Sequence, residues 1–91
     1  MNKRLHLIIH GRVQMVAFRY STRRKAHSLG ITGWVRNNSD GTVEAIFESS
    51  EEKLKEILEY CHKGPLFAKV TNLEEKWEEY KNEFDKFEIR Y

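Results

Sequence analysis

The residues from Gly11 to Tyr20, GRVQMVAFRY, combine types that could bind an anion. They place a glycine, an amide and small apolar residues between a run that alternates like a strand and a run that repeats like a helix. Arg19 stands near the start of that predicted helix, where free backbone N–H groups and the helix dipole favour negative charge. Its planar guanidinium can hold a phosphate through two parallel hydrogen bonds. We therefore predict an anion site in this loop.

Asn37 is the second residue whose side chain could do chemistry. It ends the segment ITGWVRN, and the alternation of that segment places four residues on one side, Ile31, Gly33, Val35 and Asn37. We expect helices to cover this side. An amide there can orient a water molecule by hydrogen bonding without itself carrying a charge.

Hydrophobic periodicity predicts the elements that must position these residues. Residues 5–9, LHLII, alternate as a strand. The less polar positions of residues 18–29 recur every three or four residues, which predicts a helix that ends at Gly30. Residues 31–37 and 43–47 alternate on either side of NNSDG, whose Asn, Asp and Gly favour a chain reversal. These two segments are therefore predicted to form a hairpin.

A second helix and two further strands complete the predicted fold. Ser49 and Glu52 have the spacing of a capping box, and apolar residues of 54–61 follow at helical spacing. Residues 66–78 are expected to be extended, with an imperfect period between Val70 and Leu73 that suggests a bulge or a break, and residues 87–91 alternate as a last strand. The order β-α-β-β-α-β with an extra C-terminal strand predicts an α+β fold, the ferredoxin-like α/β sandwich, whose antiparallel sheet is covered on one face by two helices.

Length and composition narrow the class of protein. Residues 1–91, with 40% hydrophobic residues, are expected to form a single folded domain. No apolar run approaches the roughly 20 residues of a membrane span, and Leu7–Ile9 is too short for a signal peptide. We therefore expect a cytoplasmic protein with no membrane partner. We also expect it to be a monomer. The single cysteine, Cys61, excludes an internal disulfide and argues against a cysteine-built metal site.

Charge is distributed unevenly along the chain. The first 39 residues contain eight Lys or Arg and no acid, whereas the remaining residues contain all 14 acids. Such polarity can prepare one surface for nucleic acid or for a small phosphorylated molecule. Alternatively, charges separated in sequence intermix on the folded surface, and the sequence leaves both possibilities open.

Two segments carry a resemblance to a known family. IHGRVQMVAFR resembles the acylphosphatase signature G-x-V-Q-G-V-x-F-R, and GWVRNNSDGTV resembles the second signature of that family, G-[aromatic]-V-[K/R]-N-x-x-x-G-x-V. The similarity continues through KGP to the final FEIRY, and so covers essentially the whole chain. It implies hydrolysis of the carboxyl-phosphate bond of acyl phosphates, a small-molecule substrate class, to a carboxylate and inorganic phosphate, with no metal and no cofactor.

The resemblance also implies roles for individual residues. Arg19 would be the catalytic arginine that binds the phosphate, and Asn37 would orient the attacking water. The backbone N–H groups of six residues would form a phosphate cradle, namely Gln14, Met15, Val16, Ala17, Phe18 and Arg19.

Met15 departs from the family pattern, which has glycine at that position. If the position requires positive φ, a non-glycine residue is strained there, and its side chain could crowd the anion. One alternative is therefore a family member that only binds an anion or whose catalysis is weakened. Another is an RNA-binding module, since such domains share this element order. The segment TVEAIFES argues against nucleic acid, because it lacks the aromatic and basic RNP1 pattern and carries two glutamates.

Overall fold

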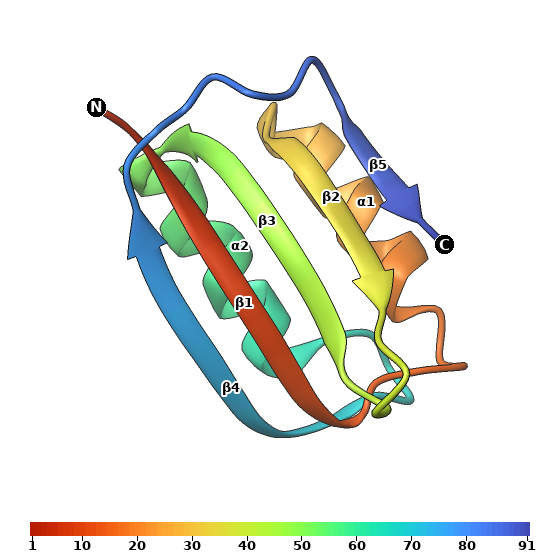
Figure 1. The fold of residues 1–91 in the computed structure, drawn as a ribbon. Coiled ribbons are helices and arrows are strands. Elements are labelled where there is room, and N and C mark those ends of the chain that lie inside the picture. The colour runs from red at the N-terminus through yellow and green to blue at the C-terminus, as the bar shows by residue number, and fades with distance from the viewer.

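A computed structural model describes residues 1–91 and shows a five-stranded sheet with two helices on one face (Figure 1). The elements are β1 Asn2–Arg12, α1 Phe18–Leu29, β2 Thr32–Asn37, β3 Val43–Ser50, α2 Glu51–Lys63, β4 Lys69–Glu78 and β5 Phe87–Arg90. The strand order across the sheet is β4-β1-β3-β2-β5. This arrangement confirms the ferredoxin-like α+β fold. None of the helices has the length and apolar content that crossing a membrane requires.

The sheet is mixed, which corrects the expectation of a wholly antiparallel sheet. Four strands pair antiparallel, but β5 pairs with β2 in parallel, with Gly33 opposite Phe87 and Val35 opposite Ile89. The connection after β4, residues 79–86, crosses one end of the sheet from edge to edge (Figure 1). After it crosses at that end, the chain runs back along the sheet antiparallel to β4. Because β2 also runs antiparallel to β4, β5 lies parallel to β2.

The imperfect period of the fourth extended segment reflects a bulge, one of the two possibilities that the sequence left open. His10 pairs with Asn72 and Gly11 with Val70, so Thr71 is the extra residue. Gly11 has φ 120°, and a Cβ there would lie 2.0 Å from a carbonyl oxygen of β4. Only glycine permits this approach, which occurs where β1 leads into the predicted anion loop.

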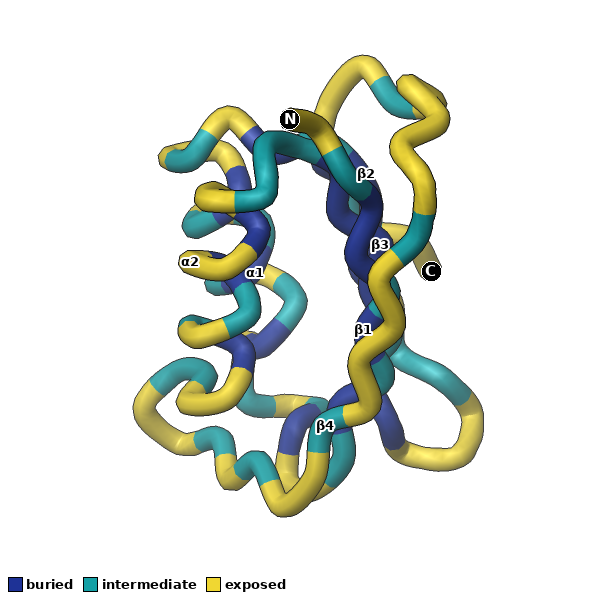
Figure 2. The backbone as a smooth tube through the Cα atoms, turned by 90° about the vertical axis from the view of Figure 1, so that its left-hand side faces the viewer, coloured by how far each residue is buried: buried dark blue, intermediate teal, exposed yellow.

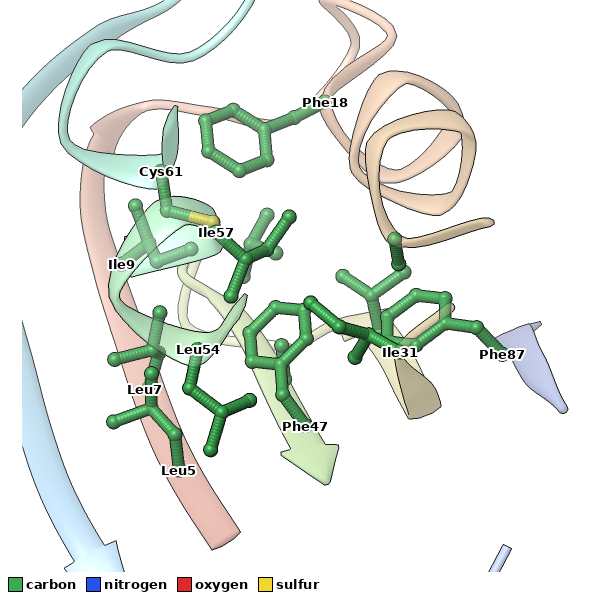
Figure 3. Packing of buried hydrophobic residues seen from close by; sticks show 14 of the residues in the cluster. Leu5, Leu7, Ile9, Phe18, Ile31, Phe47, Leu54, Ile57, Cys61 and Phe87 are labelled. Atoms are coloured by element: carbon green, nitrogen blue, oxygen red, sulfur yellow. The ribbon is translucent and has the colours of Figure 1, made fainter. Parts of the chain in front are cut away.

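The hydrophobic core lies between the sheet and the helices (Figure 2). The alternating residues of β1, Leu5, Leu7 and Ile9, are all fully buried, as their period predicts. They face the apolar side of α2, which includes Leu54 and Cys61 (Figure 3). Burial raises the pKa of the Cys61 thiol to about 12, so this cysteine is a packing residue rather than a nucleophile.

The second helix begins one residue later than the capping-box spacing suggested. Its N-cap is Ser50, whose hydroxyl accepts a hydrogen bond from the Lys53 backbone N–H at 3.4 Å. Ser49 remains in β3, where it pairs with Lys3 of β1. The ladder between these strands thus holds Ser49 in an extended conformation and leaves the next serine to cap the helix.

A buried carboxylate holds the connection between β4 and β5. The two oxygens of Glu48 accept hydrogen bonds from the backbone N–H groups of Lys81, at 2.9 Å, and Glu83, at 3.0 Å. Arg4 lies 3.4 Å from the same carboxylate and also pairs with Glu78 at 3.2 Å. Glu48 is only 2% exposed. It therefore anchors the segment that carries the chain to β5.

Replacing Glu48 with glutamine is expected to lower the free energy of unfolding by about 1 to 3 kcal/mol, because an amide N–H₂ group would face a backbone donor and the Arg4 charge would lose a buried partner. Urea denaturation measures this change. Glu52→Gln is the matched control, since Glu52 is exposed near the start of α2. The free energy of unfolding of this variant is expected to stay within about 0.5 kcal/mol of that of the original protein. Equal stabilities for the two variants would contradict the anchoring role.

Candidate active site

The loop between β1 and α1 has the backbone shape of an anion-binding nest. Met15 and Ala17 adopt left-handed conformations, with φ 61° and 62°, while Val16 between them does not have a positive φ. Alternation of this kind turns successive N–H groups toward a common point. The N–H groups of residues 14–17 donate to no backbone oxygen of the protein. They are therefore available to an anion.

Buried residues and one side chain hold this loop in place. Val13 and Phe18, on either side of the nest, are both in the hydrophobic core. The amide of Gln14 donates to the carbonyl oxygens of Asn38, at 2.8 Å, and Thr42, at 2.9 Å. Gln14 thus ties the loop to the turn between β2 and β3. The sequence indicated only a backbone role for Gln14, because these partners lie more than 20 residues away along the chain.

Arg19 lies in the first turn of α1 with a free positive charge. Its guanidinium forms no ion pair, and its Cζ atom lies 5.1 Å from the centre of the Tyr91 ring. Phe18, the preceding residue, is buried and fixes the start of the helix. The Arg19 charge is therefore stacked on an aromatic ring and not neutralised by a carboxylate.

Asn37 is the last residue of β2 and lies on the same side of the strand as the fully buried Val35, as predicted. Its Oδ1 atom is buried and accepts no hydrogen bond from another protein group. A buried amide oxygen without a partner is costly for stability. This acceptor is therefore left without a partner inside the protein.

A pocket of about 170 Å³ brings Arg19 and Asn37 together. Three more of the predicted cradle residues also line it, Met15, Ala17 and Phe18, whereas Gln14 and Val16 do not. The start of α1 and the end of β2 lie on the same side of the molecule as the C-terminus (Figure 1). The fold thus joins the two predicted catalytic side chains in one small cavity.

The C-terminal residues complete this pocket, which the sequence did not indicate. Ile89 and Tyr91 line it because β5 lies beside β2, and Tyr20 contributes from α1. Apart from its similarity to the family, the segment FEIRY showed only the alternation of a strand. No local pattern indicates which strand it joins, so no sequence signal placed Tyr91 over Arg19.

The positive charge around α1 is not neutralised on folding. Five bases of β1 and α1 take part in no ion pair, Arg12, Arg19, Arg23, Arg24 and Lys25, and of these Arg19 lines the pocket. Some bases elsewhere do pair, since Lys3 lies 3.8 Å from Glu51 and Arg36 lies 2.9 Å from Glu44. The charges intermix over part of the surface and remain positive at the site, where they attract anions.

Met15 is strained, but its side chain does not fill the nest. A left-handed conformation costs a non-glycine residue about 1 to 2 kcal/mol. The side chain of Met15 is 100% exposed, and so it lies at the mouth of the pocket. The departure from glycine therefore introduces backbone strain without blocking the N–H groups.

A larger cavity, of about 410 Å³, lies between α2 and β4. Its polar groups already have partners within the protein. Glu51 pairs with Lys3 and with Lys55, and the Trp77 indole donates to Glu75 at 3.0 Å. This cavity offers no converging free groups, and the smaller pocket is the candidate active site.

Comparisons with known proteins point in the same direction. The family model Acylphosphatase matches residues 5–89. An acylphosphatase from Thermococcus kodakarensis is 53% identical over 76 residues, 84% of this chain and 84% of the relative. One from Pelotomaculum thermopropionicum is 43% identical over 88 residues, 97% of this chain and 96% of the relative. The crystal structure of the Bacillus subtilis acylphosphatase has a TM-score of 0.94 and 34% identity, covering 100% of both chains.

Proposed function

The chain belongs to the acylphosphatase family and hydrolyses acyl phosphates, and we propose that Arg19, Asn37 and the backbone of residues 14–19 carry this reaction. The observation that supports these roles is the single small pocket in which the free charge of Arg19 and the unpartnered Oδ1 atom of Asn37 meet. The relatives do not favour the alternatives of a weakened anion-binding protein or an RNA-binding module.

The phosphoryl group binds in the nest. Its oxygens accept hydrogen bonds from the free N–H groups of residues 14–17 and from two N–H groups of the Arg19 guanidinium. The Tyr91 ring, 5.1 Å from the Arg19 Cζ atom, limits the rotamers of that side chain. These donors stabilise the charge on the phosphoryl oxygens as the bond to the acyl oxygen breaks.

Asn37 orients the water that attacks. Its Oδ1 atom accepts a hydrogen bond from one O–H of the water, which directs a lone pair of the water oxygen at phosphorus. The new P–O bond forms opposite the acyl oxygen, and the electron pair of the broken bond leaves on the carboxylate. Both water protons end on inorganic phosphate. Because a carboxylate is a weak base and leaves readily, positioning and charge stabilisation suffice without a strong general base.

The proposal also covers the setting in which the chain works. It includes a monomeric enzyme, since the steps above need no residue of a second copy. It also includes a cytoplasmic location.

Hydrolysis of acetyl phosphate in the presence of excess EDTA tests this mechanism. We expect turnover to be unchanged by the chelator and inorganic phosphate to appear in equal amount to the acetyl phosphate consumed, because every group in the proposed steps belongs to the chain. The control is spontaneous hydrolysis without protein. Loss of turnover in EDTA and its recovery on adding a divalent cation would contradict the proposal.

A further inference from the structure

We propose that the turn between α2 and β4, together with the bases beside it, binds the surface of an anionic membrane. Leu66 and Phe67 at the tip of this turn enter the lipid interface, while Arg12, Lys63 and Lys69 meet the headgroups. The expectation of no membrane partner followed from the lack of an apolar run of spanning length, and a loop attaches to one leaflet without crossing it. Such attachment suits a cytoplasmic protein, because the cytoplasmic leaflet carries negative charge.

Two large apolar side chains occupy the centre of the turn. The Ala68 N–H donates to the Pro65 carbonyl oxygen at 3.0 Å, and this hydrogen bond closes a turn whose two central residues are Leu66 and Phe67. Leu66 is 89% exposed and Phe67 is 73% exposed. Central turn positions are occupied mainly by Gly, Pro, Asn, Asp and Ser. Leucine and phenylalanine therefore present to solvent an apolar surface that the packing of the fold does not require.

Close packing on both sides holds the turn in place. Gly64 precedes it with φ 72°, and a Cβ at this position would lie 2.6 Å from Cε2 of the buried Phe18. The Gly64 N–H donates to the Tyr60 carbonyl oxygen at 2.7 Å at the end of α2. Ala68, which follows the tip, packs against the hydrophobic core. The two apolar side chains are thus held out from the surface, and binding costs little backbone freedom.

Bases without ion pairs surround the turn. Lys63 ends α2, Lys69 begins β4 and Arg12 ends β1, and all three residues are exposed at the same end of the molecule (Figure 1). None of them forms an ion pair. The sheet register places Arg12 directly opposite Lys69, and like charges in that position destabilise a sheet. An anionic surface relieves this repulsion.

Acidic residues do not offset these bases. The chain contains no acid between Glu59 and Glu74 and none before Asp40. The Glu74 carboxylate lies 2.6 Å from His10 Nε2. The Asp40 carboxylate accepts hydrogen bonds from the Thr42 N–H at 3.1 Å and from the Thr42 hydroxyl at 2.6 Å. The acids that flank these segments therefore contact other groups and leave the bases unpaired.

The shape of this surface favours a lipid interface over a protein segment. Neither Leu66 nor Phe67 lines the active-site pocket or the cavity between α2 and β4, and both side chains protrude. A peptide segment is recognised in a groove or along a strand edge. A protruding apolar tip surrounded by bases instead fits the boundary between lipid headgroups and acyl chains.

Co-sedimentation of the full chain with lipid vesicles tests this surface. One set of vesicles contains phosphatidylcholine alone, and the other contains phosphatidylcholine and phosphatidylglycerol in equal amounts. We expect partition into the anionic vesicles to be at least about 10-fold stronger, and to weaken as salt is added. Absence of binding to the anionic vesicles would overturn the proposal, and so would equal binding to the two sets.

Variants separate the apolar contribution from the electrostatic one. Leu66→Ser and Phe67→Ser should each weaken partition into the anionic vesicles by about 10-fold, because less apolar surface is transferred from water. Lys63→Gln and Lys69→Gln should each weaken it by about fivefold. Partition that stays unchanged in the serine variants would exclude insertion of the tip, and would overturn the proposal.

Lys53→Gln and Lys76→Gln are the matched controls, because both bases are exposed, form no ion pair and lie on other parts of α2 and β4. They should change partition by less than about twofold. Lys69→Glu separates binding from folding. It places a carboxylate opposite Arg12, so the melting temperature should rise while partition falls by more than about fivefold. Retained partition in this variant would contradict the role of Lys69.

An acidic polypeptide is the other class of anion that these bases suit. Calorimetric titration with polyglutamate provides the comparison. Polyglutamate binding that is weakened in Lys69→Gln and unchanged in Phe67→Ser, by a protein that leaves the vesicles unbound, would assign the surface to an acidic protein partner. That result would overturn the assignment to lipid.

Discussion

Replacement of Arg19 with alanine is expected to lower kcat/KM for acetyl phosphate by about 10²- to 10³-fold, which corresponds to roughly 3 to 4 kcal/mol of transition-state stabilisation. The guanidinium is the only side chain in the pocket that carries a positive charge. Without it, the charge on the phosphoryl oxygens has only the backbone N–H groups as donors. The measurement is steady-state release of inorganic phosphate.

Two further variants separate the contact made by Arg19 from its charge. Arg24→Ala removes the same charge from the same helix without touching the pocket, and should lower kcat/KM by less than about threefold at physiological ionic strength. Arg19→Lys keeps the charge but loses the two parallel hydrogen bonds. Its kcat/KM should therefore lie between those of the other two variants. If Arg19→Ala and Arg24→Ala had equal activities, Arg19 would act only through long-range attraction.

Replacement of Asn37 with alanine should lower kcat by about 10²- to 10³-fold and leave KM within about threefold of the original value. The amide orients water and does not hold the phosphoryl group, so its loss affects the step in which the P–O bond forms. Steady-state kinetics with acetyl phosphate separates the two constants. A rise in KM with kcat retained would instead identify Asn37 as a substrate-binding residue.

The stability of Asn37→Ala gives a second readout. Because Oδ1 is buried without a hydrogen-bond partner, its removal should leave the melting temperature unchanged or raise it. Asn38→Ala is the comparison, since the Asn38 amide donates to the Thr42 hydroxyl at 3.0 Å and its loss should lower the melting temperature. Unfolding of Asn37→Ala at a clearly lower temperature would indicate a structural role for this residue.

The residues around the loop maintain the backbone strain at Met15. Its left-handed conformation is unfavourable for methionine, yet the nest needs that conformation at this position to direct its N–H groups. The buried neighbours Val13 and Phe18, together with the hydrogen bonds of Gln14, impose it. The strain is thus held by residues around the nest, while the exposed side chain leaves its N–H groups open.

Local sequence patterns determined most of the elements of this protein. The alternation of residues 5–9 and the helical spacing of residues 18–29 each reflect burial of one face, and both elements occur as predicted, with β1 extending further at both ends. The same local reasoning placed Arg19 at the start of a helix and Asn37 at the end of a strand, on its buried side. Burial of one face is a local requirement, so a single sequence reveals it.

Only the tertiary structure decided how these residues meet. The crossing of residues 79–86 makes β5 parallel to β2 and brings Tyr91 onto Arg19, and the amide of Gln14 finds its acceptors in a turn more than 20 residues away. Such contacts depend on the direction of a connection and the register of a sheet, which leave no periodic signal in the segments involved. The sequence by itself therefore determined which residues could bind a phosphate and hold a water, and the fold decided that they share one pocket.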